Sequence, residues 1–166
     1  MSPTARPTVE GAEPPNKLAK VVNPIVKTLL LSPLHRLVSQ HLMLLTFTGR
    51  KSDRTYDVVL GRHRVGGNLM VPTGRQWRLN FRGGIPVIVT LEGRPRRGRG
   101  VLVEDPDEVA RIHELLLERI GLKNVRRLGL KVNVDRKPTN EELKTVLAGR
   151  GVISIELEEV EGNLRR

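Results

Sequence analysis

The chain lacks cysteine and has few aromatic residues. None of its 166 residues is Cys, while Trp and Tyr occur once each and Phe twice. Without cysteine the chain can form neither a disulfide nor a thiolate metal site. With so few aromatic side chains it cannot build the stacking surface on which single-stranded nucleic acids bind. These absences exclude a disulfide-stabilised domain, a zinc ribbon and a base-stacking platform.

Several sequence signals of function are also missing. The chain has no Walker A string, no Gly-x-Gly-x-x-Gly fingerprint and no nucleophile elbow. The histidines are His35, His41, His63 and His113, and none pairs with a carboxylate at metal-ligand spacing on one helix, so we expect no metal site. His113 has polar neighbours in a predicted helix, and we expect it at the surface. No run is apolar over the length of a membrane span and no secretory signal is visible, which predicts a cytoplasmic protein.

Positive charge is concentrated in one third of the chain. The net charge is +11, and residues 50–100 contribute +9 of it, with 12 Lys and Arg against 3 Asp and Glu. A local excess of this kind indicates an anionic ligand or surface. Nucleic acid is one such ligand, but no helix-turn-helix, zinc-finger or RNP-type pattern occurs. We therefore expect no specific nucleic acid and look for another anion.

The N-terminal part of the chain divides into two segments. Residues 1–16 hold four prolines and little apolar content, which predicts a flexible or extended arm. Apolar residues then recur at spacings of three and four up to residue 31, and Ser32 with Pro33 can begin a second short helix. Residues 17–40 are thus predicted to be an amphipathic helical segment. It would lie either peripherally on the inner face of a membrane, or against the rest of the chain or a partner subunit.

Residues 41–160 contain short β-compatible runs, glycine-rich turns and two helical patterns. The predicted strands cover residues 42–48, 54–60, 63–65, 69–71, 85–91, 96–103 and 151–157. Gly66-Gly67 predicts a two-residue hairpin, because both glycines can adopt positive φ. Helices are expected at residues 106–120, capped by Asp105, and at residues 139–149, with a basic connector between them. Short turns between successive strands imply antiparallel pairing, so these residues predict one α+β domain: a barrel or sandwich flanked by helices.

A basic glycine turn follows the most apolar part of the chain, residues 42–47. The turn reads Thr48-Gly49-Arg50-Lys51-Ser52. Glycine lets the backbone approach a ligand, successive N–H groups in such a turn can bind an oxyanion, and two cations add charge. The alternative is a basic hairpin turn that only faces solvent. Trp77, in the glycine-rich loop further on, would either anchor that loop on the core or line a pocket.

Several of these motifs together resemble the deazaflavin-dependent nitroreductase and quinone-reductase family of small actinobacterial proteins. They are residues 48–52, the strand that follows, Gly66-Gly67 and the run Trp77-Arg78-Leu79-Asn80. The resemblance implies an antiparallel split β-barrel similar to the FMN-binding barrels of pyridoxamine-phosphate oxidases, in chains that commonly form homodimers. It also implies a cofactor, coenzyme F-420, a deazaflavin with a phosphate and a polyglutamate tail, with FMN as the alternative.

The same resemblance implies which residues hold this cofactor. Gly49, Arg50, Lys51 and Ser52 would hold the phosphate, Pro72, Thr73, Gly74 and Arg75 would lie along the ring and tail, and Trp77 and Asn80 would shape that edge. The chain departs from the family motif at Asp53 and Tyr56, where many members have glycine and a basic residue. No nucleophile is required, because the cofactor carries the hydride.

Two functions of different classes are consistent with these expectations. The first is an F-420-dependent or flavin-dependent oxidoreductase that transfers hydride to an apolar acceptor such as a quinone, a nitro compound or an unsaturated lipid. The alternative is a non-catalytic carrier of lipid, heme or flavin on the same barrel. The F-420-dependent oxidoreductase requires saturable binding of F-420, and its absence would exclude that function.

Overall fold

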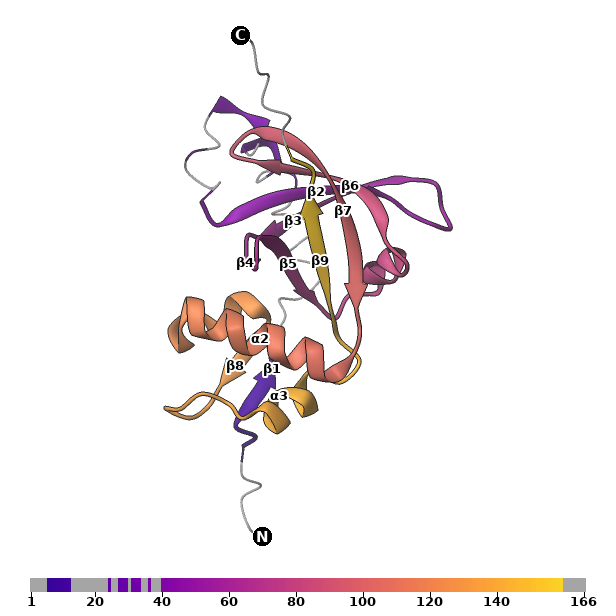
Figure 1. Ribbon diagram of the computed structural model, residues 1–166. Coiled ribbons are helices and arrows are strands. Elements are labelled where there is room, and N and C mark those ends of the chain that lie inside the picture. Colours follow the sequence, from indigo (N-terminus) through magenta and orange to yellow (C-terminus); the bar gives the residue numbers. More distant parts are fainter. Residues whose placement is uncertain are drawn as a thin grey trace.

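The computed structural model describes residues 6–12, 24, 27–29, 31–33, 36 and 40–159. A seven-stranded antiparallel sheet forms its centre, in the order β3-β2-β6-β7-β9-β5-β4. Figure 1 shows that this sheet curls and that helices lie at one end of it. The predicted α+β class, an antiparallel split β-barrel flanked by helices, is confirmed. Among the described residues, no helix is long and apolar enough to cross a membrane.

Short turns join three of the neighbouring strand pairs of the sheet, β2–β3, β4–β5 and β6–β7. Its strands are β2 (Leu42–Thr48), β3 (Thr55–Gly61), β4 (Arg64–Val65), β5 (Asn68–Thr73), β6 (Ile85–Leu91), β7 (Arg94–Val103) and β9 (Gly151–Leu157). Gly66 and Gly67 adopt φ values of 58 and 88 degrees between the paired strands β4 and β5, which confirms the predicted two-residue hairpin. Glu92 and Gly93 take positive φ in the same way between β6 and β7.

A second layer packs at one end of the sheet, in the lower part of Figure 1. It contains α2 (Pro106–Ile120), the 3-10 helix η3 (Leu122–Leu128), β8 (Leu130–Val132) and α3 (Asn140–Val146). Asp105 caps α2 by accepting the N–H of Glu108, and Gly121 ends the helix with a φ of 73 degrees. Thr139 and Glu142 form a reciprocal capping box on α3. The caps read from the sequence therefore set both helix starts.

The apolar core consists of two clusters on opposite faces of the sheet. One includes Met43, Phe47, Phe81 and Ile153, and the other joins the helical layer to Met70 and Val152. Successive residues of a strand point to opposite faces, so Val152 and Ile153 necessarily contribute to different clusters. β9 is thus buried on both sides and ties the sheet to the helical layer.

Of the flexible or extended arm expected over residues 1–16, the structure describes residues 6–12, and there the flexible alternative is corrected. Val9–Gly11 forms a strand, β1, which pairs antiparallel with β8. The segment is extended but held in place, because Val9 is buried in the cluster of the helical layer. The connector expected between the two helices likewise contains η3 and β8. A three-residue strand has too few residues to show a period, which is why neither strand was predicted.

The expectation that His113 lies at the surface is wrong. Its side chain is only 1% exposed, and Nδ1 lies 2.8 Å from the carbonyl oxygen of Val109. His113 shares the buried face of α2 with Val109, Ile112 and Leu116, which are spaced three and four residues apart. Burial lowers the pKa of His113 to about 4. The helical period, rather than the polarity of the sequence neighbours, determines the position of this residue.

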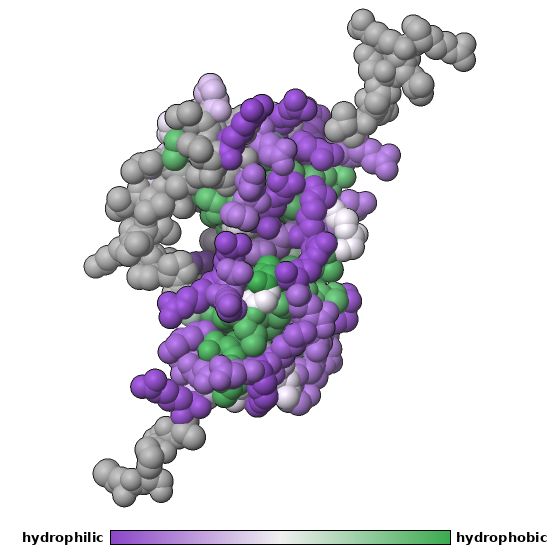
Figure 2. Space-filling model, turned by 90° about the vertical axis from the view of Figure 1, so that its left-hand side faces the viewer, coloured by the Kyte–Doolittle hydropathy of each residue, from purple (hydrophilic) through white to green (hydrophobic). Residues whose placement is uncertain are grey.

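Most of the amphipathic segment predicted over residues 17–40 lies outside the described residues. Within it, Lys27 forms an ion pair with Asp57 of β3, and Leu31 is 59% exposed. On the face drawn in Figure 2, hydrophilic residues make up most of the described surface, and hydrophobic residues are visible in smaller areas. Both roles proposed for the segment, membrane contact and packing, stay predictions.

Candidate functional site

Most N–H groups of the basic turn between β2 and β3 donate hydrogen bonds to other groups of the protein. The N–H of Gly49 donates to the carbonyl of Arg54 at 2.8 Å, and the N–H of Asp53 donates to the carbonyl of Gly49 at 3.0 Å. The N–H of Arg50 donates to Oδ1 of Asn80 at 3.0 Å. Within the described part of the chain, Lys51 and Ser52 are the turn residues whose N–H groups donate to no other group of the protein. The turn therefore offers an anion mainly side chains and, at most, these two amides.

The 3-10 helix η2 (Gln76–Phe81) lies against this turn. Asn80 accepts the Arg50 N–H through Oδ1, while its Nδ2 donates to the carbonyl of Trp77 at 2.8 Å. The guanidinium of Arg50 donates through Nη1 to the carbonyl of Arg82 at 2.9 Å. These bonds hold the turn and η2 together although they are about thirty residues apart, and they fix the Asn80 amide in one orientation.

An open pocket of ≈ 570 Å³ lies between the turn and η2. Its lining consists of Arg50, Lys51, Ser52, Tyr56, Gln76, Leu79, Asn80 and Arg82. This volume falls in the range of small-molecule sites, roughly 300–1,000 Å³. The structure thus brings together four residues predicted for the site, Arg50, Lys51, Ser52 and Asn80.

The sequence reasoning did not assign Tyr56, Gln76, Leu79 and Arg82 to the site. Tyr56 stands directly opposite Phe47 in the β2–β3 ladder, and its hydroxyl lies 3.0 Å from Oγ of Ser52. The hairpin register could have placed Tyr56 beside the turn. Leu79 lies within the motif that ends at Asn80, and Gln76 and Arg82 lie on either side of it, but only the tertiary contact with the turn shows that these three residues face a pocket.

The remaining predicted residues do not line the pocket. Pro72 and Thr73 belong to β5 and pair with β9, and Thr73 is buried. The carbonyls of Gly74 and Arg75 accept hydrogen bonds from Nη1 of Arg78 at 3.0 and 3.1 Å. Arg78 also donates through Nη2 to the carbonyl of Gly149 at 2.7 Å, so it fixes the loop that leads into η2.

An aromatic cluster lies beside the pocket. Phe47 stacks on Tyr56 and on Trp77, with ring centroids 5.6 Å apart in each pair, and meets Phe81 edge to face at 4.9 Å. Trp77 packs against the sheet cluster, which supports its interpretation as an anchor for the loop. All four aromatic residues of the chain therefore gather here. One of them, Tyr56, reaches the pocket itself.

The charges around the pocket are arranged asymmetrically. Lys51 and Arg50 belong to the exposed turn, whereas Arg82 forms a two-bond ion pair with Glu104. Hydrogen bonding to Arg82 lowers the pKa of the Glu104 carboxyl, so that it carries a full charge at neutral pH. Asp53 is exposed at the tip of the turn and adopts a φ of 51 degrees. The strongest positive potential is therefore expected at Arg50 and Lys51.

Comparisons with known proteins place the chain only loosely. No protein-family model matches it, and no curated protein matches its sequence. Among solved structures, a domain-swapped dimer is 17% identical with a TM-score of 0.46, over 82% of this chain and 98% of the other. An F-420-H2-dependent reductase (FDR-A) is 18% identical with a TM-score of 0.45, over 70% and 95%. The FAD and heme binding protein from Mycobacterium smegmatis is 18% identical with a TM-score of 0.41, over 78% and 73%. Similarity at this level does not assign the chain to a family.

Gly49 is required for the shape of the turn, and replacing it with alanine is expected to distort the pocket. A Cβ at this position would lie 2.6 Å from Oγ of Ser52 and 2.7 Å from Cε2 of Tyr56. Both lining side chains would have to move, so we expect weaker ligand binding with little loss of stability, because the turn is at the surface. Titration measures the ligand affinity of the variant and of wild type, and thermal melting measures their stability. Unchanged affinity in Gly49→Ala would show that Ser52 and Tyr56 do not form part of the site.

Proposed function

We propose that the pocket binds a phosphorylated deazaflavin, coenzyme F-420, and that the chain is an oxidoreductase using it. The observation that supports this is the composition of one pocket: Arg50, Lys51 and Ser52 suit a phosphate, while Tyr56 and Leu79 offer surface to a planar ring. The motif likeness described above suggests the deazaflavin. FMN, which also joins a planar ring to a phosphate, is the alternative cofactor.

The chain would contribute binding and orientation, while the bound deazaflavin supplies the hydride. Arg50 and Lys51 would hold the phosphate, with the Ser52 hydroxyl and the two available amides of the turn as further donors. Asn80 keeps the Arg50 backbone in place through its hydrogen bond. Holding the cofactor and an acceptor in fixed geometry can supply a large part of a rate enhancement. The acceptor we propose is apolar: a quinone, a nitro compound or an unsaturated lipid.

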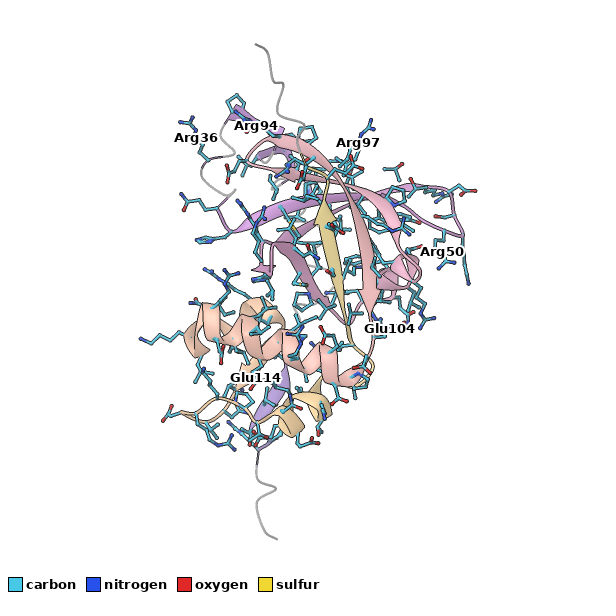
Figure 3. The ribbon with its side chains drawn as sticks, viewed as in Figure 1. Arg36, Arg50, Arg94, Arg97, Glu104 and Glu114 are labelled. Carbon is cyan, nitrogen blue, oxygen red and sulfur yellow. The ribbon has the colours of Figure 1, made fainter. Side chains whose placement is uncertain are left out.

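Replacing Arg50 and Lys51 together with alanine is expected to weaken F-420 binding by about 1–3 kcal/mol, since each loses a charge-assisted hydrogen bond to the phosphate. Equilibrium titration of both proteins measures the difference. The double variant Arg94→Ala/Arg97→Ala is a matched control, because it removes two exposed arginines that Figure 3 shows at the upper end of the molecule, away from Arg50. Equal F-420 affinity of the Arg50/Lys51 variant and wild type would mean that the turn is only a solvent-facing hairpin.

Turnover distinguishes the oxidoreductase from the carrier. The proposal expects oxidation of reduced F-420 when a quinone is added to the loaded protein, followed by the change in deazaflavin absorbance. Binding of F-420 without any oxidation, across quinone, nitro and unsaturated lipid acceptors, would favour the non-catalytic alternative.

A further inference from the structure

The pocket contains a third cation whose charge is already engaged. Nε and Nη2 of Arg82 donate to Oε2 and Oε1 of Glu104, both at 2.9 Å. Two parallel bonds of this kind are also how arginine binds the oxygens of a ligand carboxylate or phosphate. Arg82 lines the pocket, and the Glu104 carboxylate therefore occupies the position on Arg82 that an anionic group of a ligand would take.

Arg82 and Arg50 are neighbours in the pocket. The guanidinium of Arg50 donates to the carbonyl oxygen of Arg82 at 2.9 Å, which links the basic turn to the end of η2. Glu104 follows β7 directly and precedes Asp105, the cap of α2. In Figure 3, Arg50 and Glu104 lie on the same side of the molecule. Because Arg50, Lys51 and Arg82 line one pocket, anions bound at the turn and at Arg82 would be groups of one ligand.

The Arg82–Glu104 pair can be exchanged for another anion. The side chains of Arg82 and Glu104 are 57% and 39% exposed, so water screens their attraction and the pair stabilises the fold little. A ligand that brings two anionic groups gains attraction from Arg50 and Lys51 as well as from Arg82. Such a ligand can therefore replace Glu104. A ligand with one anionic group binds at Arg50 and Lys51 and leaves the Arg82–Glu104 pair intact.

We propose that Arg82 is a second anion subsite of the pocket, filled by Glu104 in the free protein, and that the ligand carries two adjacent anionic groups. A diphosphate, or a phosphate beside a carboxylate, has this chemistry. This inference rests on the proposed anion-binding pocket of Arg50 and Lys51. Glu104 would then determine specificity: it competes with the second anionic group of a ligand and leaves binding of a single anionic group unchanged.

The test is a calorimetric titration of the full chain with pyrophosphate and with inorganic phosphate at low ionic strength. Glu104→Gln removes the competing charge and keeps the shape, so it should bind pyrophosphate about fivefold more tightly, with inorganic phosphate changed by less than about twofold. Glu114→Gln is the charge-matched control, because Figure 3 shows Glu114 on α2 away from Arg50 and Glu104. It should change neither affinity.

The double variant Arg82→Ala/Glu104→Gln shows whether Glu104 acts through Arg82, because the gain in pyrophosphate affinity should then disappear. Thermal melting verifies the fold. If Glu104→Gln does not fold, Arg82→Ala alone gives the answer, since it should lose more affinity for pyrophosphate than for phosphate.

The outcomes separate this inference from the proposed function. Equal pyrophosphate affinity in wild type and Glu104→Gln, or an equal gain in Glu114→Gln, overturns the subsite. The first anion site stands in that case if replacing Arg50 and Lys51 still weakens phosphate binding. If neither wild type nor Glu104→Gln binds phosphate or pyrophosphate, the subsite is overturned, and the proposed function fails with it unless F-420 itself binds.

Discussion

Replacing Phe81 with alanine is expected to lower the free energy of unfolding by about 3–5 kcal/mol. Phe81 is fully buried and contacts Phe47 and Trp77, with ring centroids 4.9 and 5.9 Å away. Its ring also lies on Gly100, where a Cβ would be 2.7 Å from Phe81 Cδ1. The alanine variant loses the transfer free energy of the ring and leaves a cavity that the surrounding sheet cannot close.

Urea unfolding followed by Trp77 fluorescence measures this loss. Phe81→Leu is the control, since it keeps most of the apolar volume and should cost less. The consequence extends to the site, because Phe81 stands between the pocket residues Asn80 and Arg82. A loss below about 1 kcal/mol would mean that η2 does not depend on this ring for its position.

Lowering the pH from about 7 to 4 is expected to remove about 3 kcal/mol of stability through His113 alone. Burial lowers the pKa of this imidazole from 6.5 to about 4 in the folded protein. Between these two values the unfolded chain binds a proton that the folded chain does not. The contribution is therefore fully present above pH 6.5 and is lost progressively as the pH falls towards 4.

Two groups near His113 reinforce this direction and one opposes it. Repulsion from Arg150 and His63 lowers the pKa of His113 further, whereas the hydrogen bond between its Nδ1 and the carbonyl of Val109 raises it, by less than burial lowers it. His63 is itself buried, and burial lowers its pKa in the same sense, with Arg127 nearby. Protonation of His113 would thus place a positive charge between the sheet and the helical layer. None of the neighbouring groups named here is a carboxylate that could pair with it.

Urea unfolding at several pH values, in wild type and in His113→Leu, isolates this contribution. The leucine variant has no proton to bind at this position, so its stability should fall less steeply between pH 6.5 and 4. Parallel pH profiles for the two proteins would show that His113 does not carry a lowered pKa. Carboxylates titrate in both proteins alike, and their contribution cancels in the comparison.

Local chemistry made most of the fold predictable. Gly66-Gly67 specified a hairpin by their conformational freedom, and Asp105 and Thr139 marked helix starts by the N–H groups that they accept. β1 and β8 were missed because each is three residues long and they pair across most of the chain. The polar sequence neighbours of His113 indicate a surface position, whereas the helical period places it on the buried face of α2.

The candidate site was predictable on one side only. Arg50, Lys51 and Ser52 could be found because a glycine turn with two cations follows an apolar strand. The contribution of η2 depends on tertiary contacts, the hydrogen bonds from Arg50 to Asn80 and Arg82, which no local pattern records. The Arg82–Glu104 pair joins the end of η2 to the segment between β7 and α2, which are distant in sequence. Competition between Glu104 and a ligand could therefore be inferred only from the folded chain.

Titration of the purified chain with coenzyme F-420, followed by quenching of Trp77 fluorescence, tests the proposed function most directly. Trp77 is the single tryptophan and belongs to η2, the helix against which the cofactor would lie. We expect saturable quenching at micromolar cofactor in wild type and in Arg94→Ala/Arg97→Ala, with clearly weaker binding when Arg50 and Lys51 are alanine. Absence of saturable binding at micromolar F-420 in the wild-type chain would contradict a deazaflavin site in this pocket.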